Sequence, residues 1–455
     1  MSELSTISRH ALTVLAGQLA VMAFGVTDTI VAGRYAQEAL AALSIGSAVF
    51  ISVYVGLMGV LQALMPVWAE QRGANAQAAI GRSVRQSLYL WAVATALGMA
   101  VLLAPGALLR WAEVPPALQD EVTHYLAVLA FGLPPALLFR TYCTLNQALG
   151  HPLLVTWLQV LGLVIKIPLS IWFTFGGAGL PAQGAVGCAW ATLVVACCQC
   201  ALAVWLLRTQ SLYTPLQLWQ RLERPDPAQL AAFMRLGLPA GLAILVEVTS
   251  FTLMALLIAR QGTLAAASHQ IAANLAAVLY MVPLSLSIAT SARVSYWLGA
   301  QQPQRARQVV LMGFSLAALV GIALAAILFI ARYSISQIYT DNASVAAVAG
   351  TALVWVAAYH AADAVQTLCV FVLRCYRITL APLVVYCALL WGAGLAGGYW
   401  LAYGGGGPWS DVASLTPFWA ASAAALAVTA LLFVAMLWRA ISPAVQNPAS
   451  GWPGR

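Results

Sequence analysis

Apolar runs recur along the whole chain, separated by short clusters of proline, glycine and charged residues. A helix rises about 1.5 Å per residue, so a run of about 18 residues or more can cross roughly 30 Å of hydrocarbon. We predict twelve membrane-spanning helices near residues 11–33, 40–68, 85–110, 121–149, 155–176, 184–208, 229–258, 268–297, 308–333, 345–375, 381–404 and 416–440. The pattern therefore predicts an all-α integral membrane fold.

Composition supports a lipid environment. Of 455 residues, 62% are hydrophobic and 7% are charged, and the mean hydropathy is +0.87. A soluble protein of this length needs more polar residues to cover its surface. We therefore expect the bilayer, and not nucleic acid, to be the partner of this basic chain, which carries a formal charge of +8.

The distribution of charge predicts the orientation. Residues 1–10 lack a basic segment and a cleavage site, so we expect a short tail that leads into the first span. If this tail is cytoplasmic, 15 of the 21 basic residues lie on the cytoplasmic side, Arg374 among them. The opposite side then has only Arg34, Arg110, Arg260 and Arg332, but six acids: Glu38, Glu113, Asp120, Glu121, Asp341 and Asp411. Both termini are predicted to be cytoplasmic.

The two halves resemble each other. Gly73-Ala74 follows the second span as Gly299-Ala300 follows the eighth, an offset of 299 − 73 = 226 residues, and Leu145 pairs with Leu373 at an offset of 373 − 145 = 228. An even number of spans gives both copies one orientation, so we expect two pseudo-symmetric six-helix lobes around a central cavity. We place the amino-terminal lobe at 1–208, a cytoplasmic linker at 209–228, the carboxy-terminal lobe at 229–440 and a cytoplasmic tail at 441–455.

Three acidic residues lie inside apolar spans: Asp28, Glu247 and Asp363. An ionised side chain at such a depth costs roughly 2.5–3.5 kcal/mol on insertion scales, so it needs a partner, a wet cavity or a function. A buried carboxylate can exchange a proton or, with oxygen neighbours, hold sodium. We predict that these acids couple ion flow to transport; the alternative is a structural contact between helices.

Other polar residues accompany them. Tyr359 lies one turn before Asp363, so both could ligate a cation or relay a proton, and we predict a site for Na⁺ at Glu247, Asp363 and Tyr359. Lys166 is the only lysine, and Asp28 is its natural partner. That pair could be a switch broken by substrate or proton binding, or a permanent structural pair.

The eighth span carries two further polar residues, His269 and Asn274. They could line the cavity or form hydrogen bonds between helices.

Neither an enzyme nor a cofactor protein is indicated. The eight cysteines fall in or at the ends of apolar spans, and the five histidines show no ligand spacing. A nucleophile or metal site in a sizeable loop is missing from the sequence, as is a nucleotide-binding Walker A motif. We therefore expect a secondary transporter driven by Na⁺ or H⁺ and no cofactor.

Three stretches identify a family: MAFGVTDTIVAGR at 22–34, GAVGCAWATLV at 184–194 and the segment from SHQIAANL to QPQRAR at 268–307. Over essentially all twelve spans the chain resembles the multidrug and toxic compound extrusion (MATE) transporters, most closely their bacterial NorM-type branch. The resemblance implies export of organic cations against inward Na⁺ or H⁺ flow across the bacterial inner membrane, and we expect a monomer.

By matching position, Asp28 resembles the family's amino-lobe acid, and Glu247, Asp363 and Tyr359 resemble its carboxy-lobe cation site. Thr192 fits the family pattern. Lys166 departs from it: the position is often an asparagine, with Ser170 standing where a second one occurs. A lysine there could replace a bound cation.

Other membrane proteins fit less well. A major-facilitator transporter has twelve spans, but its loop signature is missing from the connection AEQRGANAQAAIGR. A lipid-linked oligosaccharide or lipid flippase of the same superfamily is a closer alternative, although we expect more basic residues in its cavity than Arg140 and Lys166. A passive channel does not require carboxylates in both lobes.

Overall fold

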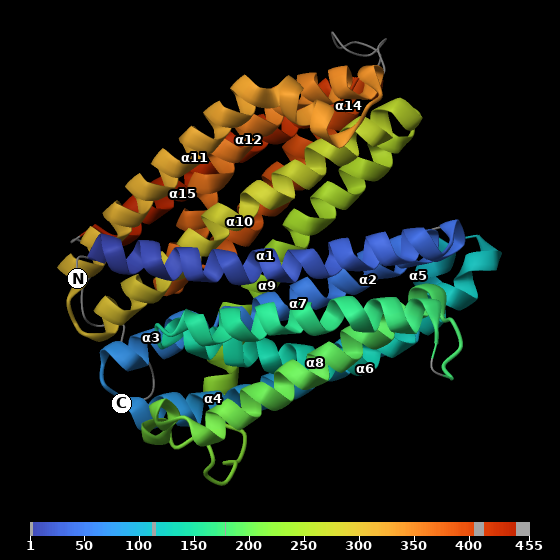
Figure 1. Ribbon diagram of the computed structural model, residues 1–455. Coiled ribbons are helices and arrows are strands. Elements are labelled where there is room, and N and C mark those ends of the chain that lie inside the picture. The colour runs from blue at the N-terminus through green and yellow to red at the C-terminus, as the bar shows by residue number, and fades with distance from the viewer. Residues whose placement is uncertain (1–2, 112–114, 178, 405–413, 443–455) are drawn as a thin grey trace. The chain divides into compact units, whose positions relative to one another are not determined.

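The computed structural model describes residues 3–111, 115–177, 179–404 and 414–442. Within these ranges twelve helical spans are long and apolar enough to cross a membrane, which confirms the predicted number. Apart from one bridge between Gly177 and Leu180, the described residues form no β-structure. The all-helical fold is visible in Figure 1. Glu113, Asp411 and most of the predicted tail lie outside the described ranges.

The chain forms two compact units, and each gathers its helices around one central span. The amino-terminal unit, Thr13–Gly241, contains α1 (Glu3–Tyr35) from Thr13 onward, α2 (Gln37–Gln62), α3 (Met65–Gly73), α4 (Gln77–Leu103), α5 (Gly106–Trp111), α6 (Pro116–Ala148), α7 (Pro152–Phe175), α8 (Gly184–Thr209) and η1 (Ser211–Leu216). Helix α6 packs against α2, α4 and α8, and α7 packs against α8. Half of the most apolar 18-residue stretch of α6 is buried, more than in the other spans of this unit, so α6 is the central span.

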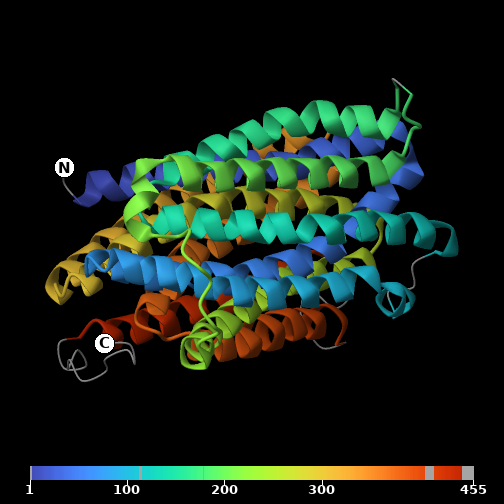
Figure 2. The same ribbon diagram turned by 90° about the horizontal axis from the view of Figure 1, so that it is seen from below.

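The carboxy-terminal unit comprises the chain from Leu242 onward together with the start of α1. It contains the second part of α9 (Pro227–Ala259), α10 (Thr263–Gly299), α11 (Pro303–Tyr339), α12 (Ala343–Cys375), α13 (Leu380–Tyr386), η2 (Cys387–Ala396), α14 (Gly397–Tyr403) and α15 (Thr416–Ala440). Helix α12 packs against α10, α11 and α15, and 56% of its most apolar 18-residue stretch is buried. Figure 2 shows these long helices from a second side.

Two predicted spans differ from the observed helices, and proline accounts for part of each difference. The second span breaks between α2 and α3, because Pro66 has no N–H to continue the helical hydrogen bonds. The third span was predicted at 85–110 but runs from Gln77 to Leu103. It ends before Pro105, which disfavours helical geometry at Ala104. It begins eight residues earlier than predicted because Arg82 lies in its first turns rather than in a loop.

The backbone repeats at the predicted offset. Asn75 follows α3 with φ 56°, and Gln301 follows α10 with φ 56°, a separation of 301 − 75 = 226 residues. Gly150 and Arg377, which follow α6 and α12, are both left-handed at φ 73° and 63°. Each turn closes with the same hydrogen bonds to the last helical carbonyls. The two halves therefore share turn geometry as well as span order.

The predicted linker, 209–228, lies within the amino-terminal unit and is bound tightly to α4. The Arg85 guanidinium donates to the Glu223 carboxylate, at 2.9 Å from Nε, and to the Gln217 carbonyl at 2.6 Å. Tyr89 donates to the Glu223 carbonyl at 2.7 Å. These hydrogen bonds from Arg85 lower the pKa of Glu223 to about 2. The division of the chain into lobes at this segment stays a prediction.

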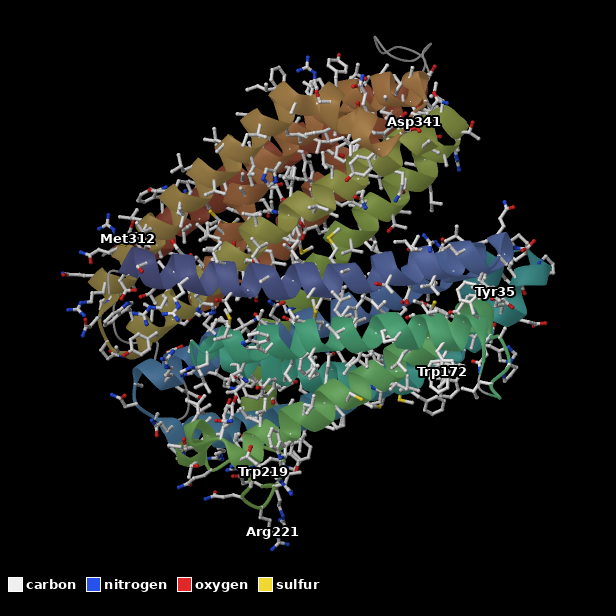
Figure 3. The ribbon with its side chains drawn as sticks, in the orientation of Figure 1. Tyr35, Trp172, Trp219, Arg221, Met312 and Asp341 are labelled. Atoms are coloured by element: carbon white, nitrogen blue, oxygen red, sulfur yellow. The ribbon has the colours of Figure 1, made fainter. Side chains whose placement is uncertain are left out.

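The ends of the helices carry exposed aromatic and charged side chains, as Figure 3 shows. Tyr35 and Trp172 lie at one end of the amino-terminal unit, and Trp219 and Arg221 lie at the other. Aromatic residues of this kind favour the membrane–water interface.

Candidate functional site

The three span acids lie on three helices: Asp28 on α1, Glu247 on α9 and Asp363 on α12. Asp28 belongs to the amino-terminal unit, and the other two belong to the carboxy-terminal unit. Asp28 and Asp363 are buried, with 9% and 3% of their surface exposed, and Glu247 is half-buried. Each unit therefore has its own cluster of ionisable groups.

In the amino-terminal unit, Asp28 pairs with Lys166. The Lys166 Nζ lies 2.7 Å from Asp28 Oδ1, and Ser170 Oγ donates to the same oxygen at 3.0 Å. Lys166 also donates to Thr192 Oγ1 at 2.6 Å and to the Cys188 carbonyl at 3.1 Å. The structure thus places four predicted residues in one cluster.

Helical spacing explains this cluster. Lys166 and Ser170 are four residues apart on α7, and Cys188 and Thr192 are four apart on α8, so each pair shares one helix face. Helices α7 and α8 pack along each other. Burying a lysine without acceptors is costly, and the facing oxygens of α1 and α8 supply them.

In the carboxy-terminal unit, Asp363 begins a short hydrogen-bonded chain. Its Oδ1 accepts from Gln366 Nε2 at 2.8 Å and from Thr367 Oγ1 at 3.2 Å. Gln366 in turn accepts from the hydroxyl of Tyr386 on α13. Among the described residues, no hydrogen bond reaches Oδ2 of Asp363, which leaves that oxygen free for another ligand.

Glu247 lies close enough to Asp363 for the two carboxylates to interact electrostatically. Within the described part of the chain, Arg374 is the cation that acts on Glu247, and both carboxylates influence the phenols of Tyr280 and Tyr359. Among the described residues, Glu247 forms no hydrogen bond or ion pair. Two carboxylates against one guanidinium give this cluster a net charge of −1 when all three are ionised.

Arg374 lies in the last turn of α12, at the end of a span, and its placement on the cytoplasmic side stays a prediction. It is 3% exposed and packs inside α12, with its guanidinium carbon 4.4 Å from the ring centre of Phe371. Its Nε and Nη1 are buried without a hydrogen-bond partner. An arginine at the end of a span can therefore be buried within the helical bundle.

An aromatic wall borders Tyr359. Its ring packs edge to face against Phe251, with 5.6 Å between the ring centres, and against Trp419, with 6.0 Å between the ring centres. The ring centre of His269 lies 5.7 Å from that of Trp419. Flat ring faces attract organic cations through their quadrupoles. Trp419 is completely buried and Tyr359 nearly so, which leaves Phe251 as the partly exposed ring of this wall.

Asn274 does not join His269. Its Oδ1 accepts from the hydroxyl of Tyr339, at the end of α11, at 3.1 Å. Five residues correspond to about 500° of helix rotation, so the two side chains point to different faces. The structure thus separates these two residues, although both lie on α10.

Sequence reasoning missed four members of the carboxy-terminal cluster. Gln366 and Thr367 follow Asp363 by three and four residues, so the helical period could have found them. Tyr280 and Tyr386 lie on other helices, and only the packing of those helices brings them near the carboxylates.

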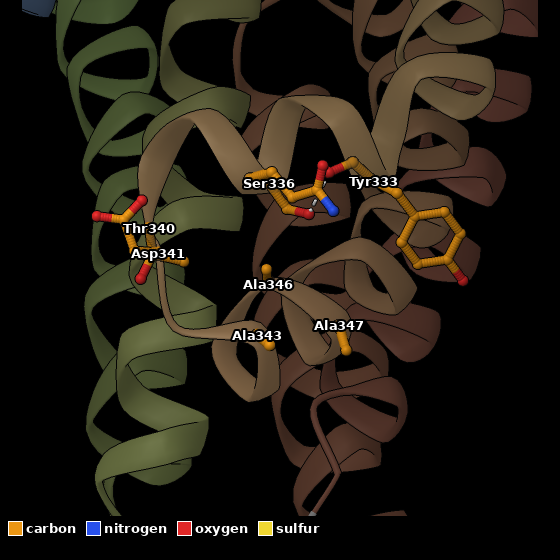
Figure 4. Close-up of a pocket in the computed structure, with 8 residues that line it drawn as sticks. Tyr333, Ser336, Thr340, Asp341, Ala343, Ala346 and Ala347 are labelled. Atoms are coloured by element: carbon orange, nitrogen blue, oxygen red, sulfur yellow. Dashed lines mark hydrogen bonds between the residues drawn. The ribbon is translucent and has the colours of Figure 1, made fainter.

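A surface hollow lies elsewhere. About 440 Å³ in volume, it opens where α11 turns into α12, as Figure 4 shows. Tyr333, Ser336 and Thr340 line it, together with the exposed Asp341, and the Ser336 hydroxyl bonds to the Tyr333 carbonyl at 2.9 Å. None of the span carboxylates lines this hollow.

Known proteins resemble this chain along most of its length. The MatE family model matches residues 14–172 and 239–400. A probable multidrug resistance protein NorM from Aromatoleum aromaticum is 37% identical over 93% of this chain and 91% of its own. The multidrug resistance protein PmpM from Pseudomonas aeruginosa is 32% identical over 88% of this chain and 84% of its own.

Solved structures share the fold. The eukaryotic MATE transporter AtDTX14 superposes with a TM-score of 0.84 at 20% identity, covering 97% of this chain and 98% of its own. The Vibrio cholerae MATE transporter VcmN in its bent form gives a TM-score of 0.82 at 19% identity, covering 97% of both chains.

Proposed function

Because the chain belongs to the MatE family of multidrug efflux transporters, we propose that it exports organic cations in exchange for inward Na⁺ or H⁺. It is a multi-pass membrane transporter and not an enzyme. We further propose that it works as a monomer in a bacterial inner membrane with both termini cytoplasmic. The bacterial relatives and the distribution of basic residues support this placement.

The pair of carboxylates Glu247 and Asp363 carries the proposal. Arg374 is a cationic neighbour of Glu247, so two carboxylates and one guanidinium give the cluster one negative charge in excess when all three groups are ionised. Such a charge in an apolar span is costly unless a cation or proton neutralises it. The cluster is therefore suited to take up and release one monovalent cation.

Oxygen atoms are available for that cation. Asp363 Oδ2 and the Glu247 carboxylate have no hydrogen-bond partners among the described residues, and the hydroxyls of Tyr359 and Tyr280 are near. Hard cations prefer oxygen ligands, and a carboxylate can alternatively accept a proton. The same groups suit Na⁺ and H⁺, so the coupling ion needs an experiment.

Exchange follows from competition for one charge. An organic cation that packs against the partly exposed ring of Phe251, which contacts Tyr359, neutralises the carboxylates in place of the coupling ion. If the two ligands favour different conformations, binding of one releases the other and shifts the population of states. This is the energetic requirement of alternating access.

The test is efflux of ethidium from proteoliposomes under an imposed Na⁺ gradient or an imposed pH gradient. We expect one gradient to drive efflux, and we expect Asp363→Asn and Glu247→Gln each to abolish that dependence. Asp341→Asn is the matched control, because that acid is exposed at the α11–α12 turn. Efflux that ignores both gradients, or that survives in both carboxylate variants, would overturn the proposal.

A further inference from the structure

The ammonium group of Lys166 is completely coordinated inside the protein. An ammonium has three N–H donors, and three acceptors lie within 2.6–3.1 Å of Nζ: Asp28 Oδ1, Thr192 Oγ1 and the Cys188 carbonyl. The side chain is 0% exposed. Its acceptors come from two different helices, α1 and α8, so the ammonium holds them around one point.

This shell has the composition of a small cation site. Its three contacts are a carboxylate, a hydroxyl and a carbonyl oxygen, which are the ligands that hard cations prefer. Ser170 adds a hydroxyl bound to the same carboxylate oxygen. Lysine therefore stands where a monovalent cation with oxygen ligands would otherwise stand.

The charge around Asp28 is balanced. Lys166 on α7 is the cation at the carboxylate, and among the described residues Tyr125 on α6 and Cys188 on α8 also interact with it. The sum of Asp28 and Lys166 is zero, whereas the cluster of Glu247, Asp363 and Arg374 sums to −1. A neutral pair has no excess charge with which to attract a free cation or proton.

We propose that Lys166 is a tethered counter-cation that closes the Asp28 site to free Na⁺ and protons. Removing the ammonium leaves a buried carboxylate without its partner, and such a group recruits a cation or a proton. The consequence that ion exchange is confined to the carboxy-terminal unit rests on the proposed function. The closure of the Asp28 site does not.

The experiment uses binding, so that it is independent of transport. Thermal unfolding of the full-length protein in detergent is followed in NaCl and in choline chloride at equal ionic strength, between pH 5 and 8.5. Glu247→Gln and Asp363→Asn are present throughout to silence the carboxy-terminal carboxylates. A ligand that binds only the folded state raises the melting temperature as its concentration rises.

With Lys166 in place, we expect no response to Na⁺ that depends on Asp28. Lys166→Asn, which replaces the ammonium by an amide oxygen, should make the melting temperature rise by a few degrees with Na⁺ or as the pH falls. Asp28→Asn added to Lys166→Asn should remove that response. Lys166→Arg is the matched control, because it keeps the charge and should remain unresponsive.

Two results overturn the proposal. The first is a melting temperature that responds to Na⁺ or pH while Lys166 is present and no longer responds after Asp28→Asn. This comparison does not need Lys166→Asn, so it remains valid even if that variant does not fold. The other is a folded Lys166→Asn protein that responds to neither ion. Neither result decides the gradient-driven efflux experiment. The proposal for Lys166 and the proposed transport function can therefore be contradicted independently.

Discussion

At the residue scale, the two buried clusters differ in how their carboxylates are compensated. Asp28 faces an ammonium at 2.7 Å, whereas Asp363 accepts only from the neutral side chains of Gln366 and Thr367. A neutral donor stabilises a carboxylate without cancelling its charge. One cluster is therefore suited to hold structure, and the other is suited to exchange ions.

Asp28→Asn should destabilise the protein because it leaves the buried ammonium of Lys166 without its counter-charge. Breaking a buried ion pair costs about 3–5 kcal/mol, and replacing both partners costs less. We expect the double variant Asp28→Asn, Lys166→Met to be more stable than Asp28→Asn alone when unfolding is followed in detergent. Additive losses in the double variant would show that the two side chains do not depend on each other.

Individual residues also show how far the sequence could be read. The pair of Asp28 and Lys166 was predictable, because a charged side chain inside a span needs a partner of opposite charge and the spans contain few such residues. The cluster at Asp363 was only partly predictable. Tyr386 reaches Gln366 from α13, and no spacing along the chain encodes that approach.

At the scale of elements, the two halves of the chain repeat the same turn geometry after corresponding helices. The residues that follow α3 and α10 both have φ 56°, but the first is Asn75 and the second is Gln301. Asparagine tolerates the left-handed region better than glutamine does. The same backbone is therefore strained more in the second half than in the first.

Gln301→Gly should raise the free energy of unfolding by about 1 kcal/mol, because glycine adopts a positive φ without a steric penalty. Asn75→Gly should give a smaller gain. Gln302→Gly is the control, since residue 302 has φ −120° and gains nothing from glycine. Thermal unfolding measures the stability of all three variants. If Gln301→Gly lowers the free energy of unfolding as much as the control does, the backbone at Gln301 is not strained and the interpretation is contradicted.

The segment 209–228 is the element whose behaviour differs most from the expected linker. Composition indicated a polar connection, but its backbone carbonyls at Gln217 and Glu223 are bonded by side chains of α4. Sequence could not reveal this, because Arg85 lies 138 residues from Glu223. A charged residue at the end of a predicted loop gives the same sequence pattern whether its side chain is in solvent or bonded to another segment.

Arg85→Met should loosen this segment and cost about 2 kcal/mol, because a buried guanidinium loses bonds to a carboxylate and a carbonyl. The folded pKa of Glu223, about 2, lies below its ordinary value of 4.5, so this stabilisation is present above about pH 4.5 and is lost as the pH falls toward 2. We therefore expect a constant difference from the unchanged protein between pH 5 and 8.

Limited proteolysis within 209–228, together with unfolding at several pH values, checks this prediction. Arg221→Met is the control, because it changes a nearby arginine in the exposed part of the segment. An effect of Arg85→Met that vanishes between pH 8 and 5 would contradict the assigned ion pair.

At the scale of the whole molecule, the hydrophobic pattern predicted the twelve spans, because each span must satisfy its own backbone within lipid. The family was predicted from three short sequence stretches, and the family model confirms it. The span boundaries were less predictable where proline or charge lies near a helix end, as at Pro66 and Arg82. When all three groups are ionised, Glu247, Asp363 and Arg374 sum to −1, whereas Asp28 and Lys166 form an ion pair with no net charge. A transporter with this distribution should exchange one monovalent cation for each monovalent drug cation.

The measurement that tests this account most directly is ion release on drug binding by the purified protein in weakly buffered detergent solution. Ethidium binding is followed by fluorescence, and H⁺ and Na⁺ are followed with selective electrodes. We predict release of about one H⁺ or one Na⁺ per bound ethidium, with release lost in the Glu247→Gln, Asp363→Asn protein and retained in Asp341→Asn. Ethidium binding that releases neither ion, or release that persists without both carboxylates, would contradict it.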